Sequence, residues 1–370
     1  MGTIPLLHAS EPNISTAKLN SISPSLHWYN KSCAYRFVLS NCRGVAKLPA
    51  SPRAEIGIIT HKLLKWSSSR RVIGVSLHEA EKKFEELLTE RQTELAASPL
   101  TVSIANLSKS CDVFRERRYA AIKHSECHSL PQTLNARTGS KKIYTEQSLT
   151  SPDGLVSGTM DAIYIYGEDI HVVDKKTGKV SEGGQIKGAY REQLYLYAGL
   201  IDECLGQMPV KLSLVDGDGR RWEIPFSYEH VRSNYQAAKD WLLALREEVK
   251  SNPQNVQNLA EAYPANCKYC QFRPTCKPYR KASRLNSVGF PTDFYSQVAS
   301  IQTLKQATIV HFSGYDSKLS LRVTSNVLAS HPILTELKAG DRIIVTNVEM
   351  IGKQLEPTIS TVIFKDIRLI

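Results

Sequence analysis

Two aspartates and a lysine lie in one short stretch of the chain, GTMDAIYIYGEDIHVVDKKTGK. Asp161 begins one β-rich run and Asp174 ends the next, and the Gly-Glu-Asp between the runs predicts a hairpin. Such a hairpin brings both carboxylates to one end of a sheet. Lys176 follows Asp174 by two residues and therefore lies on the same strand face. Carboxylates hold Mg²⁺ or Mn²⁺, and an ammonium stabilises charge that develops on phosphorus, so this group predicts phosphodiester hydrolysis.

Four further polar residues lie on the neighbouring expected elements. His61 lies on a helix that should begin at a proline, and Glu146 lies at the foot of the strand before the hairpin. Gln193 and Tyr197 are four residues apart and share one face of the helix that follows. Taken singly, each has an ordinary structural interpretation, as a packed histidine, a surface carboxylate or the polar positions of an amphipathic helix.

As an ordered set, these residues match a known pattern: a histidine, a glutamate, G-x-x-D, D-x-K-T-G and Q-L-x-x-Y. Over residues 23–280 the chain resembles the PD-(D/E)XK nucleases of the RecB type. That group includes the AddB nucleases, the CRISPR-associated nucleases of spacer adaptation and the nuclease domain of a eukaryotic replication helicase-nuclease. The resemblance implies an α/β, restriction-endonuclease-like core in which a central mixed sheet is flanked by helices.

The resemblance also implies roles for these residues in a Mg²⁺- or Mn²⁺-dependent deoxyribonuclease. Lys176 would be the catalytic lysine, and the remaining polar positions would support the site or contact the DNA backbone. The implied metal ligands are His61, Asp161, Asp174 and the backbone carbonyl of Lys175. The implied catalytic set is Asp161, Asp174, Lys176, Glu146, Gln193 and Tyr197.

Three cysteines near the end of this region form a C-x2-C-x5-C pattern, at Cys267, Cys270 and Cys276. Thiols this close together indicate a metal site. Both Zn²⁺ and iron–sulfur clusters usually require four thiolate ligands. Spacing alone does not choose between the two. The candidates for the fourth ligand are Cys33, Cys42, Cys111, Cys127 and Cys204.

Cys33 is the fourth ligand that the resemblance favours. It stands in S-P-S-x3-Y-x3-C-x2-R-F, which is similar to the segment of AddB-like nucleases that carries the first cysteine of a [4Fe–4S] cluster. Ala34 follows it where many of those enzymes have proline. Cys127 lies in H-S-E-C-H, but no partner pattern supports a separate His/Cys site there.

A basic run overlaps the cysteine pattern and contains no acidic residue. It is either a solvated loop or, beside a nuclease core, a surface that contacts DNA phosphates. The predicted DNA-binding residues are Lys268, Arg273, Lys277, Arg280, Lys281 and Arg284.

The C-terminal region has short strands at regular spacing, which is typical of a small all-β barrel. Its segment from Leu337 to Asn347 resembles a strand of an OB-fold. OB-folds often bind single strands with stacking aromatics, but few are present here, chiefly Phe312, Tyr315 and Phe364. Docking to a protein is the competing interpretation.

Composition agrees with an intracellular protein that meets a polyanion. The 370 residues carry a formal net charge of +11, and eight cysteines without a secretory signal indicate a reducing, cytoplasmic environment. No apolar run is long enough to cross a bilayer, so we expect no membrane association. The expected organisation is a loose leader over 1–22, a nuclease domain over 23–285 and an OB-like domain over 298–370.

The interpretation that follows is a metal-dependent DNA nuclease, acting on single-stranded DNA or DNA ends, with a structural [4Fe–4S] cluster. The alternatives are a non-catalytic DNA-end-binding subunit of a repair or defence complex and a zinc-stapled RNA-binding protein. The two Gly-Lys pairs lack the upstream glycine of a P-loop, so any motor would come from a partner such as a helicase.

Overall fold

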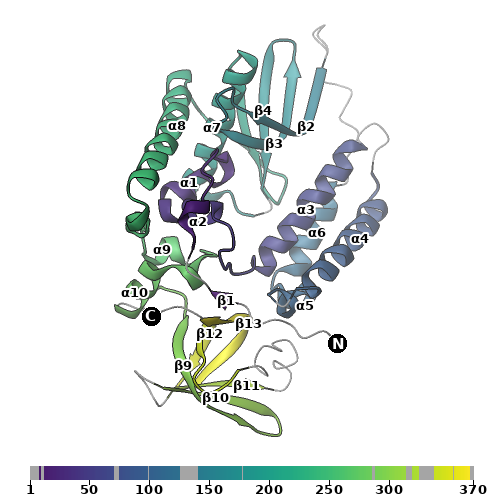
Figure 1. Ribbon diagram of the computed structural model, residues 1–370. Coiled ribbons are helices and arrows are strands. Elements are labelled where there is room, and N and C mark those ends of the chain that lie inside the picture. The colour runs from purple at the N-terminus through teal and green to yellow at the C-terminus, as the bar shows by residue number, and fades with distance from the viewer. Residues whose placement is uncertain are drawn as a thin grey trace.

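Figure 1 shows the computed structural model, in which a mixed α/β body lies above a β-barrel. Cys127 and Tyr315, both considered above, lie outside the part of the chain that the structure describes. The described residues are 8–9, 12–70, 75–98, 100–125, 141–176, 178–285, 288–313, 319–324, 337–352 and 354–366. Among these residues, no helix has the length and apolar character needed to span a membrane.

The body contains a five-stranded sheet in the order β2-β3-β4-β7-β8. Its neighbours are antiparallel except for β4 and β7, which are parallel. The expected hairpin is β3–β4, and Gly167 takes the left-handed φ of 62° that its turn requires. The strands are β2 (Lys141–Thr150), β3 (Ser157–Tyr166), β4 (Asp169–Lys175), β7 (Lys211–Val215) and β8 (Arg221–Glu223), with a separate small hairpin of β5 (Ser181–Glu182) and β6 (Gln185–Ile186).

One group of helices packs on this sheet through α7, which contacts β2, β3, β4 and β7. Helix α8 lies against α7 so closely that a Cβ on Gly199 would come within 2.5 Å of the Tyr235 ring. The segment after Ser23 forms two helices, because Cys33 has an extended backbone and caps the second one. These helices are α1 (Pro24–Lys31), α2 (Ala34–Asn41), α7 (Gly188–Leu205) and α8 (Tyr228–Ser251).

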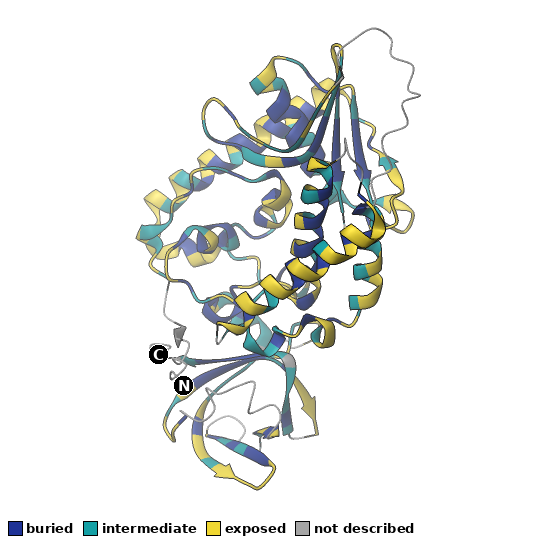
Figure 2. Ribbon diagram, turned by 90° about the vertical axis from the view of Figure 1, so that its right-hand side faces the viewer, coloured by how far each residue is buried: buried dark blue, intermediate teal, exposed yellow. Residues whose placement is uncertain are grey.

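A second group of helices has an apolar core of its own, which includes Ile59, Leu63 and Phe84. Ser76 and Glu79 form a capping box at the start of α4. Figure 2 shows the exposed outer faces of the helices and the buried strands of the sheet. This group consists of α3 (Pro52–Ser69), α4 (Leu77–Ala96), η2 (Val102–Ile104), α5 (Leu107–Ser110) and α6 (Phe114–Ser125).

The segment before α1 differs from the loose leader expected over 1–22. Ile22 is fully buried and forms a parallel bridge with Val156, and Leu19 is buried as well. Strand β1 (His8–Ala9) pairs in parallel with the last strand of the barrel, and η1 (Ile14–Thr16) lies between the two contacts. Buried apolar residues therefore join this segment to the body, and backbone pairing joins it to the barrel.

The C-terminal region forms a closed barrel of five strands. Strand β9 pairs with β10, β10 with β11, β11 in parallel with β13, β13 with β12, and β12 again with β9. Val310, Leu321 and Leu355 are fully buried inside it. The strands are β9 (Phe294–Thr303), β10 (Ala307–Ser313), β11 (Ser320–Thr324), β12 (Arg342–Ile351) and β13 (Gln354–Asp366).

The barrel packs on the body through a small apolar cluster. Ile344, Val362 and Phe364 of the barrel are buried against Leu48, which precedes α3. The connection between the two parts is the cysteine segment, made of η3 (Pro253–Leu259), α9 (Pro264–Cys267), η4 (Arg273–Thr275) and α10 (Lys277–Leu285).

Candidate active site

Three acidic residues lie at the same level on three adjacent strands. Glu146 and Asp161 both lie between the same two pairs of β2 and β3, Thr145–Ala162 and Gln147–Met160. Asp174 is one residue beyond Ala162–Val173, the last pair of β3 and β4, and this places it beside Asp161. The expected meeting of Asp161 and Asp174 therefore takes place in the middle of β3 and near the end of β4.

His61 reaches this row from α3. Its Nδ1 lies 3.9 Å from Asp161 Oδ1. The ligand atoms of His61, Glu146 and Asp161 all lie within 4.8 Å of one another, and each of the three residues is half-buried. Two carboxylates and one imidazole in a partly open position suit a divalent cation such as Mg²⁺ or Mn²⁺.

Glu146 has an unusual backbone for a residue within a strand. Its φ is 52°, in the left-handed region that non-glycine residues rarely occupy. The ladder between β2 and β3 has no pair at this position, although it continues on both sides. Such a conformation costs on the order of 1–3 kcal/mol and is found most often at functional sites. The left-handed backbone of Glu146 thus sets the direction of its side chain, which lies with His61 and Asp161.

Asp174 is held by Lys176 and Gln193 and does not join the compact group of His61. The Lys176 Nζ lies 2.8 Å from Asp174 Oδ2 and donates to Gln193 Oε1 at 2.8 Å. Gln193 Nε2 donates to Asp174 Oδ1 at 2.9 Å, which closes a three-residue ring of contacts. Burial raises the pKa of Asp174 to about 6; the Lys176 ammonium opposes this change and the Asp161 charge adds to it.

Tyr197 links this ring of contacts to strand β3. Its hydroxyl donates to the carbonyl of Thr159 on β3 at 2.8 Å and accepts from Gln193 Nε2 at 3.3 Å. The side chain is buried, and burial raises the pKa of Tyr197 above its usual range. Tyr197 therefore positions Gln193 and has no exposed surface for the DNA backbone, one of the two roles considered for it.

Lys175 contributes its backbone to the site. Its N–H donates to Asp161 Oδ2 at 2.5 Å, so β4 orients the carboxylate of β3. The expected role of its carbonyl as a metal ligand stays a prediction.

Tyr190 was not predicted as a site residue. Its ring centroid lies 4.9 Å from Lys176 Nζ, a distance suited to a cation–π contact. Tyr190 precedes Gln193 by three residues on α7, so the helical spacing that linked Gln193 to Tyr197 also pointed to it.

The four cysteines of the expected metal site line one cavity of about 20 Å³. Cys33 comes from the start of α2, and Cys267, Cys270 and Cys276 come from the cysteine segment. Burial raises the pKa of Cys267 and of Cys276 to about 12, with a contribution from the neighbouring thiols. The other described candidates, Cys42, Cys111 and Cys204, do not line this cavity.

Asn266 holds the two sides of the cysteine cavity together. Its Nδ2 donates to the carbonyl of Ser32 at 2.7 Å and to that of Glu261 at 3.0 Å. Arg36 on α2 donates in return to the carbonyl of Asn266. Cys33 is therefore fixed against α9 by hydrogen bonds, independently of any metal.

The predicted DNA-binding residues separate into two kinds. Arg273 is a correction: it is only 3% exposed and forms an ion pair with Asp293, so it cannot contact a phosphate. Arg280 is half-buried, with its guanidinium 5.4 Å from the Tyr295 ring centroid. Lys268, Lys277 and Lys281 are exposed, and the side chain of Arg284 lies outside the described part of the structure.

Comparison with known proteins agrees with this geometry. The model of the PD-(D/E)XK nuclease superfamily matches residues 21–277. No curated protein matches the chain significantly. One similar solved structure, from Eubacterium rectale, carries a provisional description as an exonuclease; it is 10% identical, with a TM-score of 0.36 over 73% of this chain and 94% of that one. The family match spans the acidic row, Lys176 and all four clustered cysteines, and the chain belongs to the PD-(D/E)XK nuclease superfamily.

Proposed function

We propose that this protein is a Mg²⁺- or Mn²⁺-dependent deoxyribonuclease of the RecB type that acts on single-stranded DNA or DNA ends. The observation that carries the proposal is the convergence of His61, Glu146 and Asp161 within 4.8 Å, beside Lys176. This metal set replaces Asp174 of the sequence-based set with Glu146. The basic composition and the exposed lysines of the cysteine segment support a nucleic-acid substrate.

The residues present fit a divalent cation. The His61, Glu146 and Asp161 ligand atoms are close enough to share one ion, and the buried Asp174 Oδ2 is balanced by the Lys176 ammonium at 2.8 Å. A bound cation would polarise the phosphate and lower the pKa of an attacking water. In this proposal Asp174 does not bind the cation directly. It supports the site by fixing Lys176.

Lys176 is placed to hold the scissile phosphate. Its ammonium is fixed by Asp174, Gln193 and the Tyr190 ring, so little reorganisation is needed when charge develops on phosphorus. Gln193 keeps Asp174 and Lys176 in place, since it donates to Asp174 and accepts from Lys176. The chain thus supplies a fixed cation beside a carboxylate row, an arrangement suited to metal-dependent phosphodiester hydrolysis.

We further propose that the four cysteines bind a [4Fe–4S] cluster, with Zn²⁺ as the alternative. In a tetrahedral zinc site with Zn–S bonds of about 2.3 Å, the sulfurs lie about 3.8 Å apart. Among the residues that the structure describes, no three of these sulfurs lie within 4.8 Å of one another. The raised thiol pKa values indicate that a cation is needed to hold the thiolates, and the resemblance to AddB-like nucleases favours the cluster over zinc.

For the barrel we propose an OB-like fold, supported by its five strands, its closure and its parallel β11–β13 pair. Phe312 and Phe364 are buried, so two of the three aromatics considered for base stacking cannot serve that role. The barrel then contacts the DNA backbone or docks a protein. Removal of the barrel should make the salt dependence of DNA binding shallower if it contacts DNA, whereas an unchanged slope supports docking.

Cleavage of end-labelled single- and double-stranded DNA with Mg²⁺, Mn²⁺ or excess EDTA tests the main proposal. We expect cation-dependent cleavage by the wild type and none by Lys176→Ala, while Lys250→Ala on the exposed end of α8 serves as the matched control. Cleavage that persists in EDTA or in Lys176→Ala contradicts the mechanism. DNA binding without any cleavage supports the non-catalytic alternative.

A further inference from the structure

A small pocket opens beside the proposed active site, between α3, α6 and the ends of β4 and β7. Its volume is about 100 Å³. It shares Lys175 and Lys176 with the active site, and Thr60, the neighbour of His61, also faces it. The lining consists of Thr60, Leu64, Arg117, Ala120, Ala121, His124, Lys175, Lys176, Val215, Asp216 and Gly217.

The pocket has an apolar wall and a positively charged part. Leu64, Ala121 and Val215 provide the wall, and Ala120 leaves room where a larger residue would fill it. Arg117, Lys175 and Lys176 supply the positively charged part of the lining; the Arg117 guanidinium donates to the carbonyl of Arg53, and the Lys176 ammonium contacts Asp174 and Gln193. A nucleotide has the matching pair of features, a flat heterocycle next to a phosphate.

The polar atoms of the wall are already paired within the protein. Thr60 Oγ1 donates to the carbonyl of Ile56 at 2.8 Å, and His124 Nε2 contacts the carbonyl of Gly217. The Asp216 carboxylate accepts from two backbone N–H groups of its own turn and from the Trp222 indole at 2.7 Å. A wall with satisfied polar atoms offers no hydrogen bonds that would distinguish one base from another.

We propose that this pocket binds the nucleobase of a nucleotide adjoining the scissile phosphate, without regard to base identity; this rests on the proposed nuclease function. Lys176 lines the pocket, so when the scissile phosphate is held at Lys176, the base of the adjoining nucleotide lies within reach of the pocket. An enclosed apolar cavity of about 150 Å³ holds a whole benzene molecule, so this pocket of about 100 Å³ takes the edge of one heterocyclic ring and leaves the rest of the base outside it. The base then fixes the register of the strand, and the metal row cleaves beside it.

The test uses single-stranded oligonucleotides that keep one cleavable bond, with nuclease-resistant linkages elsewhere. In a set of copies, each nucleotide in turn is replaced by an abasic unit. We expect cleavage by the wild type to fall about tenfold when the abasic unit adjoins the cleavable bond on one side, because the apolar contact is lost. Exchange of the base at that position should change the rate by less than about threefold.

A protein variant provides the second arm. Ala120→Leu should cleave the intact strand about tenfold more slowly, yet cleave the abasic copy as fast as the wild type does, since the filled pocket and the missing base remove one and the same contact. Ala237→Leu, an exposed alanine on α8, is the matched control and should behave as the wild type.

The outcomes separate the two levels of the proposal. Equal cleavage of all abasic copies by the wild type overturns the pocket and leaves the nuclease function standing. Strong dependence on base identity overturns the inference of indifferent binding. No cleavage of any strand overturns the nuclease function and this inference with it. The abasic series needs only the wild type, so it decides even if Ala120→Leu fails to fold.

Discussion

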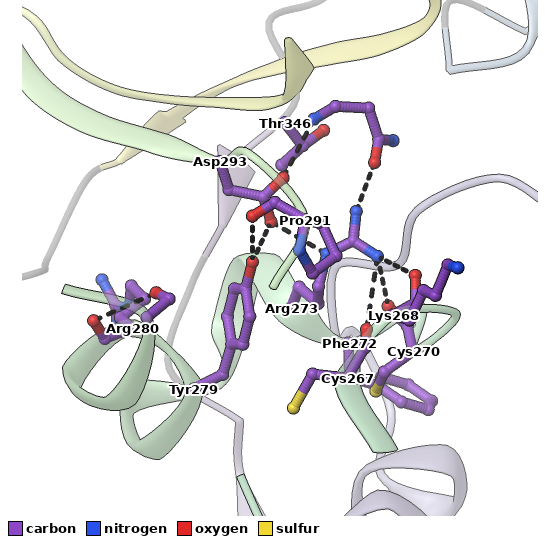
Figure 3. A network of polar contacts seen from close by, with 12 residues as sticks. Cys267, Lys268, Cys270, Phe272, Arg273, Tyr279, Arg280, Pro291, Asp293 and Thr346 are labelled. Atoms are coloured by element: carbon purple, nitrogen blue, oxygen red, sulfur yellow. Dashed lines mark hydrogen bonds and ion pairs between the residues drawn. The ribbon is translucent and has the colours of Figure 1, made fainter. Parts of the chain in front are cut away.

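Arg273 and Asp293 form a buried ion pair, with 2.8 Å between Arg273 Nε and Asp293 Oδ2. Figure 3 shows the guanidinium at the centre of a network that also reaches the carbonyls of Lys268 and Cys270. Asp293 lies just before β9, where it accepts from Tyr279 and from the backbone of Asn347. One arginine thus joins the cysteine segment to the barrel.

Arg273→Met should destabilise the protein by about 3–5 kcal/mol, because it leaves the Asp293 carboxylate buried without its partner. Urea unfolding measures the change. The double variant Arg273→Met/Asp293→Leu should recover part of the loss, since both charges are then gone. Lys281→Ala, on the exposed face of α10, should change the stability by less than about 0.5 kcal/mol. Equal stability of the wild type and Arg273→Met would show that the network is not structural.

Glu146 should limit the stability of the metal-free protein while it serves cleavage. Glycine tolerates a φ of 52°, so Glu146→Gly should be more stable than Glu146→Ala by about 1 kcal/mol. Both variants should lose most of the cation-dependent cleavage, since each removes a carboxylate of the metal group. Thermal melting in EDTA gives the comparison. Full activity in either variant would return the metal role to Asp174.

Cys33→Ser should lose the metal of the cysteine site, as Cys270→Ser should. Cys111→Ser is the control, because that thiol is equally buried but lies in the apolar cluster of α3 to α6. Iron content and visible absorption of anaerobically purified protein report the result, with about four irons per chain expected for the wild type. A colourless wild type with one zinc per chain rules out the cluster. Full metal content in Cys33→Ser rules out this residue as a ligand.

His27 should make the protein less stable at mildly acidic pH. The side chain is buried in α1, its ring packs edge-on to Trp241, and burial, aided by the Lys31 charge, lowers the pKa of His27 to about 4. Because the unfolded chain has a His pKa near 6.5, protonation favours unfolding. The stabilisation is complete above pH 6.5 and decreases as pH falls toward 4, with a loss of about 2 kcal/mol between pH 7 and 5.

The comparison variant is His27→Gln, whose unfolding free energy should change less over this range. It retains Glu192, whose Oε1 lies 3.4 Å from His27 Nε2 and whose own pKa is raised by burial. His78→Gln on exposed α4 controls for histidine content. Parallel pH profiles for the wild type and His27→Gln would show that His27 becomes charged within the folded protein.

Local sequence signals predicted the elements that position the site. A proline predicted the start of α3, and alternation with a glycine turn predicted the β3–β4 hairpin. The order of motifs along the chain was enough to connect Asp161, Lys176 and Gln193. These features depend on residues close in sequence or on helical and strand periods.

The features that sequence did not predict are set by tertiary contacts. The left-handed backbone of Glu146 is held by the pairs that β2 forms with β3 on either side of it along the strand, and no local residue type indicates it. In the sequence, Arg273 is one of several cations in a basic run. Only the fold shows that it is buried in an ion pair with Asp293. The same holds for Ile22, whose partner Val156 is far along the chain.

Strand β1 covers part of the edge of β13, which matters while the chain folds. The edge of β13 is covered over its first residues by β11, and at Lys365 and Asp366 by β1. An uncovered strand edge is a template for pairing with another molecule. During synthesis His8 and Ala9 emerge long before β13, so their pairing has high contact order and forms late. A folding intermediate with a complete barrel but an undocked β1 would leave the edge of β13 open at Lys365 and Asp366, and the docking of two residues covers this end of the strand.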